Sequence, residues 1–393
     1  MSRAPEFPRY PITAWSVCTA LGVTTAETVA GLSAERSGLV APSVELPFAT
    51  VCGALPSKLD ALAPSFAQYE SPVGRIVAQL HTELSLSLER AVTRWGSDRV
   101  AVVLGTSVGG LAVTEDALAI HHATGVFPAE YDLYKRHSLH AAADLIAVRA
   151  GLRGPRFALS TACSSSGKVF ATAQRLLRAN VVDAVVVGGV DSLTQTTLRG
   201  FHSLSVLSPV PCRPFGHNRE GMNLGEGGAL FLIERDGDAR AKLLGVGESA
   251  DAYHMSSPHP EGAGAKAAML GALSQAGLEP SDVDHINAHG TGTPKNDQVE
   301  AKVIREVFGE GVPVVSTKGA TGHTLGAAGA VEAAFAIVAL EEGWIPASLH
   351  ATPIDPEVQV SVNLARRALR CRAVLSNSFG FGGSNVSVLL GAA

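Results

Sequence analysis

The sequence predicts an α/β protein with largely parallel, buried sheets, and two patterns support this. Short apolar runs typical of buried strands recur along the chain. They cover 100–104, 157–159, 184–187, 229–233, 312–315 and 386–390. Helical patterns, with apolar residues every three or four positions, stand between some of these runs at 165–179 and 298–308. Strands that alternate with helices are typical of sheets covered by helices on both faces.

The sequence contains two segments of similar build, one in each half of the chain. Ser160-Thr161 and Ser316-Thr317 each follow an apolar strand, open a turn of small residues and lead into a helix. A further apolar run comes after each helix. This faint repeat predicts two similar halves, residues 1–238 and 239–393, which meet near 236–240.

Composition limits the classes of partner and location. Only 17% of the 393 residues are charged and the formal net charge is -5, so no broad basic surface for nucleic acid or an anionic membrane is expected. No apolar run approaches the roughly 18 residues of a spanning helix, and prolines stand where a signal peptide needs an apolar core. The five cysteines include no CxxC pair, which favours reduced thiols. We therefore expect a cytoplasmic protein.

Cys163 follows an apolar strand within a turn of small residues, FALSTACSSSG, where a helix begins. We expect Cys163 in the first turn of that helix, where free N–H groups and the positive end of the helix dipole stabilise a thiolate. A lowered thiol pKa would make this cysteine a nucleophile. The same residues are equally typical of an ordinary packed corner between a strand and a helix.

Histidine and hydroxyl side chains gather in DHINAHGTGTPKNDQVE, residues 284–300. A short strand would end near His289. The turn after it would place Thr291 and Thr293 at the carboxyl end of a sheet, where ligands tend to bind in α/β proteins.

Other residues of this segment have simpler roles. His285 and His289 lack a third metal ligand at a familiar spacing, so no metal site is expected. Asp297 and Glu300 are expected to cap the following helix rather than catalyse.

Two glycine-rich segments follow. In STKGATGHTLGAAGAVE, a charged Lys318 within an apolar stretch needs a partner, and Glu332 is the candidate. His323 in the same stretch would, taken alone, more often be a hydrogen-bonded core histidine. In SNSFGFGGSN, the glycines around Phe379 and Phe381 permit positive φ and expose N–H groups, so this segment is either an oxyanion loop or a tight turn.

Together the four segments resemble the β-ketoacyl-acyl-carrier-protein synthases, the condensing enzymes that elongate fatty acids and polyketides. TACSSS, HGTGTPKND, KGATGHTLGAAGAVE and SNSFGFGGSN occur in the order and approximate spacing of that family. CRPFGHNREGMNLGEGGALFLIER, at 212–235, is similar to its segment between the halves. The resemblance covers roughly 105–390. It implies a thiolase-like fold, a layered αβαβα core made of two similar halves.

The resemblance also implies the reaction. Cys163 would carry an acyl group as a thioester. His289 and His323 would donate N–H bonds to the malonyl thioester oxygen and stabilise the enolate that forms as carbon dioxide leaves. Lys318 would hold His323 in place through a network with Glu332.

Further roles come from the same resemblance. The N–H groups of Cys163 and Phe381 would form a second oxyanion hole, with Phe379 and Phe381 in the gating loop. Thr291 and Thr293 would meet a phosphopantetheine arm. Because that arm belongs to the acyl carrier protein, the chain itself would need no cofactor.

The implied partners are the acyl- and malonyl-loaded carrier protein and a second chain. This chain would form a homodimer, or a heterodimer with a chain-length-factor-like protein. Since the carrier is acidic, docking would use a local basic patch, for which the candidates are Lys135, Arg136 and Arg199.

Three alternatives remain open. A plain thiolase would condense without decarboxylation and commonly uses a second cysteine as base, which the two histidines count against. A non-catalytic chain-length partner usually lacks the nucleophile, and Cys163 counts against that class. A Cys–His hydrolase would release a free acid instead of forming a carbon–carbon bond.

Overall fold

The computed structural model describes residues 8–393, and its centre is one eleven-stranded sheet. From one edge to the other, the strands are β12 (Ser361–Val362), β10 (Pro313–Val315), β9 (His285–Asn287), β14 (Ala373–Gly380), β15 (Ser384–Ala392), β8 (Ala241–Ala250), β1 (Tyr10–Cys18), β7 (Gly227–Glu234), β6 (Ala184–Asp191), β4 (Val100–Gly105) and β5 (Arg156–Leu159). Two small ribbons pair β2 (Leu39–Val40) with β3 (Cys52–Gly53) and β11 (Trp344–Ile345) with β13 (Arg367–Ala368).

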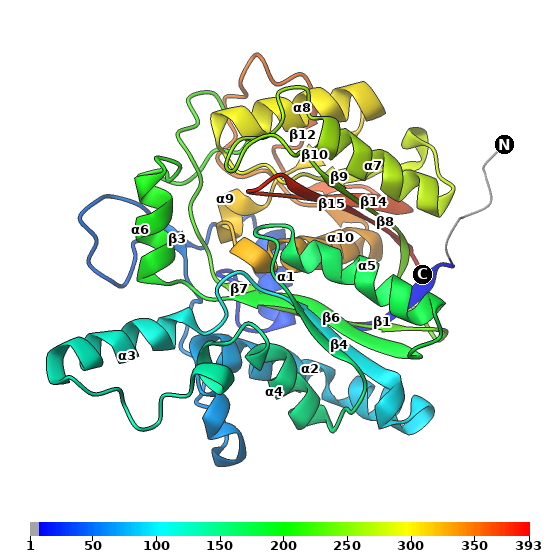
Figure 1. Ribbon diagram of the computed structural model, residues 1–393. Helices are drawn as coiled ribbons and strands as arrows, with labels where there is room; N and C mark the ends of the chain where they lie inside the picture. Colours follow the sequence, from blue (N-terminus) through cyan, green and yellow to red (C-terminus); the bar gives the residue numbers. More distant parts are fainter. Residues whose placement is uncertain (1–7) are drawn as a thin grey trace.

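Helices lie on both faces of the sheet and between its two halves (Figure 1). They are α1 (Thr25–Ser33), α2 (Pro72–Trp95), α3 (Leu111–Thr124), α4 (Ala141–Ala150), α5 (Ser165–Arg178), α6 (Gln195–Ser203), α7 (Ala263–Ala276), α8 (Pro294–Phe308), α9 (Lys318–Thr321) and α10 (Ala328–Glu342). Helices α2 and α4 cover β1, β7, β6 and β4 from outside, while α7 and α8 cover the C-terminal strands. Helices α5 and α10 pack against each other in the middle, which gives the predicted αβαβα layering.

The prediction of largely parallel sheets is correct only at the two ends. Strands β4, β5 and β6 pair in parallel, and so do β9, β10, β12 and β14. The pairs between β14 and β6 are antiparallel. For β14 and β15 the reason is local, because only three residues join them, and a parallel pair needs a long crossover.

The boundaries of the two predicted helices differ in accuracy. Helix α5 ends one residue before the predicted 165–179. Helix α8 begins four residues before the predicted 298, because Pro294 occupies its first turn, where the missing N–H costs nothing.

The two predicted halves share the sheet. The connection near 238 joins β7 to β8, and β1 pairs with both of these strands. A division into two domains at this point therefore stays a prediction. Within residues 8–393, no helix is both long and apolar enough to cross a membrane.

Candidate active site

Cys163 lies in a tight turn between β5 and α5. It is two residues before the first residue of α5, Ser165, so the predicted place in the first helical turn is wrong. The residue before it, Ala162, has φ +52°, an unfavourable conformation for a residue with a Cβ. This turn aims the thiol at the cavity described below.

The expected lowering of the Cys163 thiol pKa is also wrong. Burial raises the pKa of Cys163 to about 11, because desolvation outweighs the opposing effects of the Lys318 charge and the Phe381 N–H. At neutral pH the resting residue is a thiol. Burial raises the pKa of the other four cysteines as well, but of the five only Cys163 lines the cavity.

His289 follows β9 and is held through its backbone. Glu300, on α8, accepts the N–H groups of His289 at 2.7 Å and of Gly290 at 2.8 Å. Asp297 accepts the N–H of Gly292 at 3.2 Å. Both carboxylates therefore fix the loop before α8. The prediction that they cap α8 is wrong. Both carboxylates lie on α8, which holds them in place.

His285, in contrast, does not join the site. Its Nδ1 lies 3.2 Å from the carbonyl oxygen of Pro313, and burial lowers its pKa to about 4. His285 is therefore a buried histidine of the core.

His323 is fully buried after α9, and its backbone N–H donates to the carbonyl oxygen of Asn223 at 2.7 Å. Neither of its ring nitrogens has a hydrogen-bond partner among residues 8–393. A buried imidazole with two unpaired nitrogens costs stability, which points to a partner outside the chain.

Lys318 has an ammonium group enclosed by three acceptors. It donates to the Glu332 carboxylate and the His289 carbonyl oxygen, and its Nζ lies 3.5 Å from His289 Nδ1. The predicted pairing with Glu332 is present, but Lys318 contacts His289 rather than His323. The ammonium favours a lone pair on Nδ1, which leaves the proton of neutral His289 on Nε2.

Both site histidines are neutral. Burial and the nearby Lys318 charge lower the pKa of His289 and His323 well below the usual 6.5. Their rings meet edge to face, with centroids 5.2 Å apart. Neutral imidazoles can each donate one N–H without carrying a buried charge.

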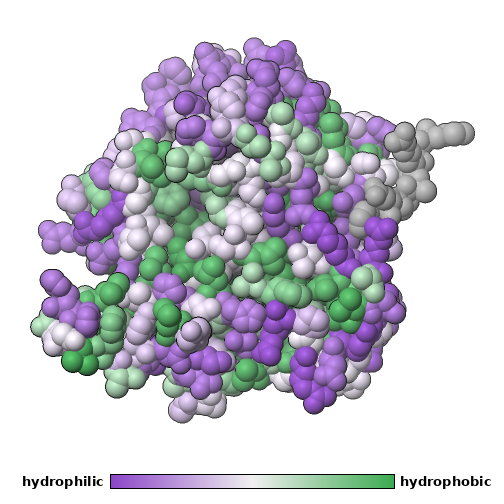
Figure 2. All heavy atoms as spheres, viewed as in Figure 1, coloured by the Kyte–Doolittle hydropathy of each residue, from purple (hydrophilic) through white to green (hydrophobic). Residues whose placement is uncertain are grey.

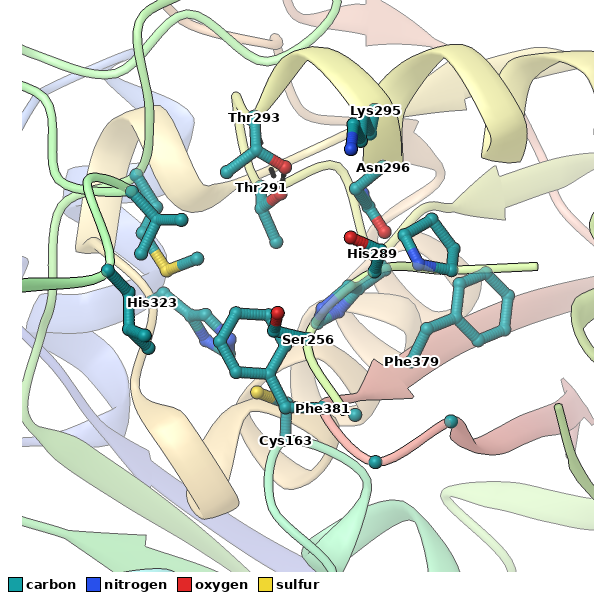
Figure 3. A pocket seen from close by; sticks show the side chains of 18 of the residues that line it. Cys163, Ser256, His289, Thr291, Thr293, Lys295, Asn296, His323, Phe379 and Phe381 are labelled. Carbon is teal, nitrogen blue, oxygen red and sulfur yellow. Dashed lines mark hydrogen bonds between the residues drawn. The ribbon is translucent and has the colours of Figure 1, made fainter. Parts of the chain in front are cut away.

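The three reactive side chains converge at one point. The Cys163 Sγ and one ring nitrogen each of His289 and His323 all lie within 4.8 Å of one another. They line a cavity of about 400 Å³, in which Figure 3 shows them grouped close together. The nucleophile comes from the N-terminal half of the sequence and both histidines come from the C-terminal half.

The remaining predicted residues form the walls of this cavity. The Thr291 and Thr293 hydroxyls lie 2.9 Å apart on one side (Figure 3). The Phe379 ring packs near the His289 ring, with centroids 5.9 Å apart. Phe381 also lines the cavity, and its ring stacks on Phe201.

Several other residues of the wall were not predicted from the sequence. These are chiefly Met222, Ser256, Lys295, Asn296 and Asn385. Lys295 and Asn296 belong to the same HGTGTPKND motif as Thr293, so the motif itself could have indicated them. Met222 and Asn385 also lie within quoted motifs, at 212–235 and 376–385. Of the five, only Ser256 comes from a segment without a motif.

A metal is a poor fit to the same three ligands. A sulfur and two imidazoles match zinc chemistry, which normally needs a fourth ligand or a bound water. However, the Lys318 charge already acts on Cys163 and on both histidines, and it would oppose a second cation there.

None of the three predicted docking residues lines this cavity. Lys135 donates to the Tyr69 hydroxyl and lies 3.9 Å from Asp144, while Arg136 donates to a backbone carbonyl. Arg199 is exposed on α6, whose C-terminal end leads into the cavity wall at Leu204. Their role in docking stays a prediction.

The layered fold and the cysteine beside two neutral histidines define an enzyme built to transfer acyl groups. Models of the N-terminal and C-terminal domains of beta-ketoacyl synthase match residues 12–239 and 240–352. The chain belongs to the β-ketoacyl synthase family.

Individual relatives agree with this assignment. The chain is 34% identical to 3-oxoacyl-[acyl-carrier-protein] synthase 2 of Synechocystis sp. over 76% of each sequence, and 34% identical to that of Staphylococcus aureus over 74% of this chain and 76% of the relative. Among solved structures, the ketosynthase ApeO in complex with its chain length factor ApeC, from Xenorhabdus doucetiae, matches over the full length of both chains with 37% identity and a TM-score of 0.93. A beta-ketoacyl synthase from Burkholderia phymatum matches over 98% of this chain and 99% of that one, with 25% identity and a TM-score of 0.88.

Proposed function

We propose that the chain condenses an acyl group held on Cys163 with malonyl-acyl carrier protein, giving 3-oxoacyl-acyl carrier protein and carbon dioxide. The observation that carries this proposal is the thiol and two neutral imidazoles within 4.8 Å of one another in one cavity. A thiol can hold the acyl group, and neutral imidazoles can donate N–H bonds to a developing enolate.

In the first step, Cys163 Sγ attacks the acyl thioester and the carrier's thiol leaves. Because the resting Cys163 is protonated, its proton must move as the bond forms, and it passes to the departing carrier sulfur. A neutral imidazole beside Sγ is positioned to relay this proton. The N–H groups of Cys163 and Phe381 stabilise the oxygen of the tetrahedral intermediate.

In the second step, the bond between the malonyl carboxylate and C2 breaks and its electron pair forms the enolate. The Nε2–H of His289 and an N–H of His323 stabilise the enolate oxygen. C2 then attacks the thioester carbon on Cys163, and the released thiolate takes up a proton. Lys318 positions His289, with Glu332 balancing its charge.

We further propose that the Thr291 and Thr293 hydroxyls meet the phosphopantetheine arm of the carrier and that Phe379 and Phe381 form the gating loop beside the thioester. The chain would use no metal or cofactor of its own. Its five free cysteines support a reducing, cytoplasmic location.

A second thiolase-like chain is the proposed structural partner. The N-terminal end of the sheet is an open edge at β5, where Phe157 is 44% exposed. Hydrophobic side chains also lie exposed over α3, including Leu118 and Ile120 (Figure 2). The ApeO ketosynthase was solved with its chain length factor, so either a second copy or such a factor fits this role.

The decisive experiment uses two substrates in order. An acyl thioester donor is added first, and the mass of the peptide with Cys163 is measured. Malonyl-loaded carrier protein follows, and carbon dioxide and 3-oxoacyl product are quantified. The proposal expects all three signals, whereas release of free acid without carbon dioxide would indicate a hydrolase.

A further inference from the structure

Two turns with unfavourable backbone conformations stand next to reactive residues. Ala162, directly before Cys163, has φ +52°. Leu325, two residues after His323, has the same φ of +52°. Such conformations in residues with a Cβ persist only where surrounding contacts impose them.

One buried carboxylate lies between these turns. Asp191 ends β6 with no exposed surface. It accepts the N–H groups of Ser107 and Val108, at 2.9 to 3.0 Å, in the loop that begins α3. Gly326, which directly follows Leu325, packs closely against the same carboxylate. Burial raises the pKa of Asp191 to about 6, and the bonds to these donors oppose that rise.

Ser107 extends this connection to the nucleophile. Its Oγ donates to the carbonyl oxygen of Ala162 at 3.2 Å. A Cβ placed on Gly326 would lie 2.6 Å from the Ser107 nitrogen and 2.8 Å from the Asp191 carboxylate, so the segments pack with no spare room. The carboxylate thus contacts the segment after His323 directly and the segment before Cys163 through one hydroxyl.

We propose that Asp191 is a positioning residue that sets the orientations of Cys163 and His323 together, through Ser107 and Gly326. This inference rests on the proposed function. Asp191 touches neither substrate nor the reacting atoms, since it is not part of the cavity wall. Its carboxylate makes charge-assisted bonds to several N–H donors, and an asparagine would turn an NH₂ group toward one of them.

The test separates the two half-reactions. Ser107→Ala removes only the bond to Ala162, so acylation of Cys163 should slow by about 10-fold while decarboxylation of malonyl-pantetheine stays normal. Asp191→Asn should slow both by on the order of 100-fold, as expected when reacting groups shift by about 1 Å. Loss of folding alone would not separate the half-reactions in this way.

Matched controls remove the same kinds of bond elsewhere. Ser85→Ala loses a hydroxyl bond to a carbonyl oxygen on α2, and Asp284→Asn alters a carboxylate that accepts two backbone N–H groups. Both should keep wild-type rates. Normal acylation in Ser107→Ala, or equal slowing of both half-reactions in that variant, overturns the inference. If Asp191→Asn does not fold, the rates of Ser107→Ala alone decide whether the inference stands. A wild-type protein that shows neither half-reaction overturns the proposed function instead.

Discussion

Replacing Lys318 with methionine tests what a fully enclosed ammonium group contributes. The Lys318 and Glu332 side chains are only 2% and 3% exposed, so their charges are hardly screened by water. Without the lysine, the Glu332 carboxylate and the His289 carbonyl oxygen both lose their donor. Breaking a buried ion pair from one side costs about 3 to 5 kcal/mol. We expect Lys318→Met to lose that much free energy of unfolding.

The double variant Lys318→Met/Glu332→Gln isolates the orphaned charge. Because it leaves no unpaired carboxylate, it should be more stable than Lys318→Met alone, although two residues are changed. Urea unfolding at pH 8 measures the three free energies, with wild type as reference.

The pH dependence of the single variant has a defined sign. Burial already raises the pKa of Glu332 to about 7 against the pull of Lys318, and loss of the lysine raises that pKa further. A folded-state pKa above the unfolded one gives stability that is lost as pH rises through the folded value. Lys318→Met should therefore be less destabilised at pH 5.5 than at pH 8. Equal losses at both pH values, or a double variant that is no more stable than Lys318→Met, would refute this reasoning.

Four further outcomes are expected. Iodoacetamide should label Cys163 ahead of the other cysteines. The labelling rate should rise about 10-fold per pH unit from pH 7 to 10, because the pKa of the Cys163 thiol is about 11. A rate that reaches a plateau below pH 8 would mean that the thiolate already predominates there. Cys163→Ala should still release carbon dioxide from malonyl carrier protein, while His289→Ala or His323→Ala should release it on the order of 100-fold more slowly; unchanged release from both would exclude the two-histidine mechanism. Gly380→Ala should slow acylation but not decarboxylation, because its Cβ would lie 3.3 Å from the Cys163 nitrogen and 2.9 Å from a carbonyl oxygen in the nucleophile turn; equal rates would show that the loop can shift at no cost. Arg199→Glu should raise KM for carrier-bound substrate and spare a pantetheine thioester, and an equal effect on both would place docking elsewhere.

The reactive residues could be predicted because each lies within a short motif, and the motifs follow one another in the order found in the β-ketoacyl synthase family. Cys163, His289 and His323 could be identified without knowing how the sheet is built, because each lies in or beside a local turn that places it at the cavity. The Lys318–Glu332 pair followed from a single argument, that a lysine in an apolar stretch requires a counter-ion.

The environments of these residues were less accessible to sequence reasoning. The Cys163 pKa depends on desolvation by segments far away in the chain, which outweighs the helix start beside it. Likewise, Asp297 and Glu300 have the spacing of helix caps, but the loop that carries His289 folds back over α8 and takes their hydrogen bonds. Asp191 has no motif of any kind. The residues that contact it come from the loop between β4 and α3 and from the turn after His323.

The origin of the nucleophile and the histidines in different halves has a consequence for biosynthesis. At ordinary translation rates, His323 leaves the ribosome on the order of ten seconds after Cys163. During that interval the cysteine lacks the segments around Lys318, Glu332 and Phe381, so its thiol has the acidity and exposure of one in an open chain. Oxidants and alkylating agents would therefore damage the nascent polypeptide more readily than the finished protein. Oxidative stress would then inactivate newly made molecules first, while the existing population keeps its sulfur protected.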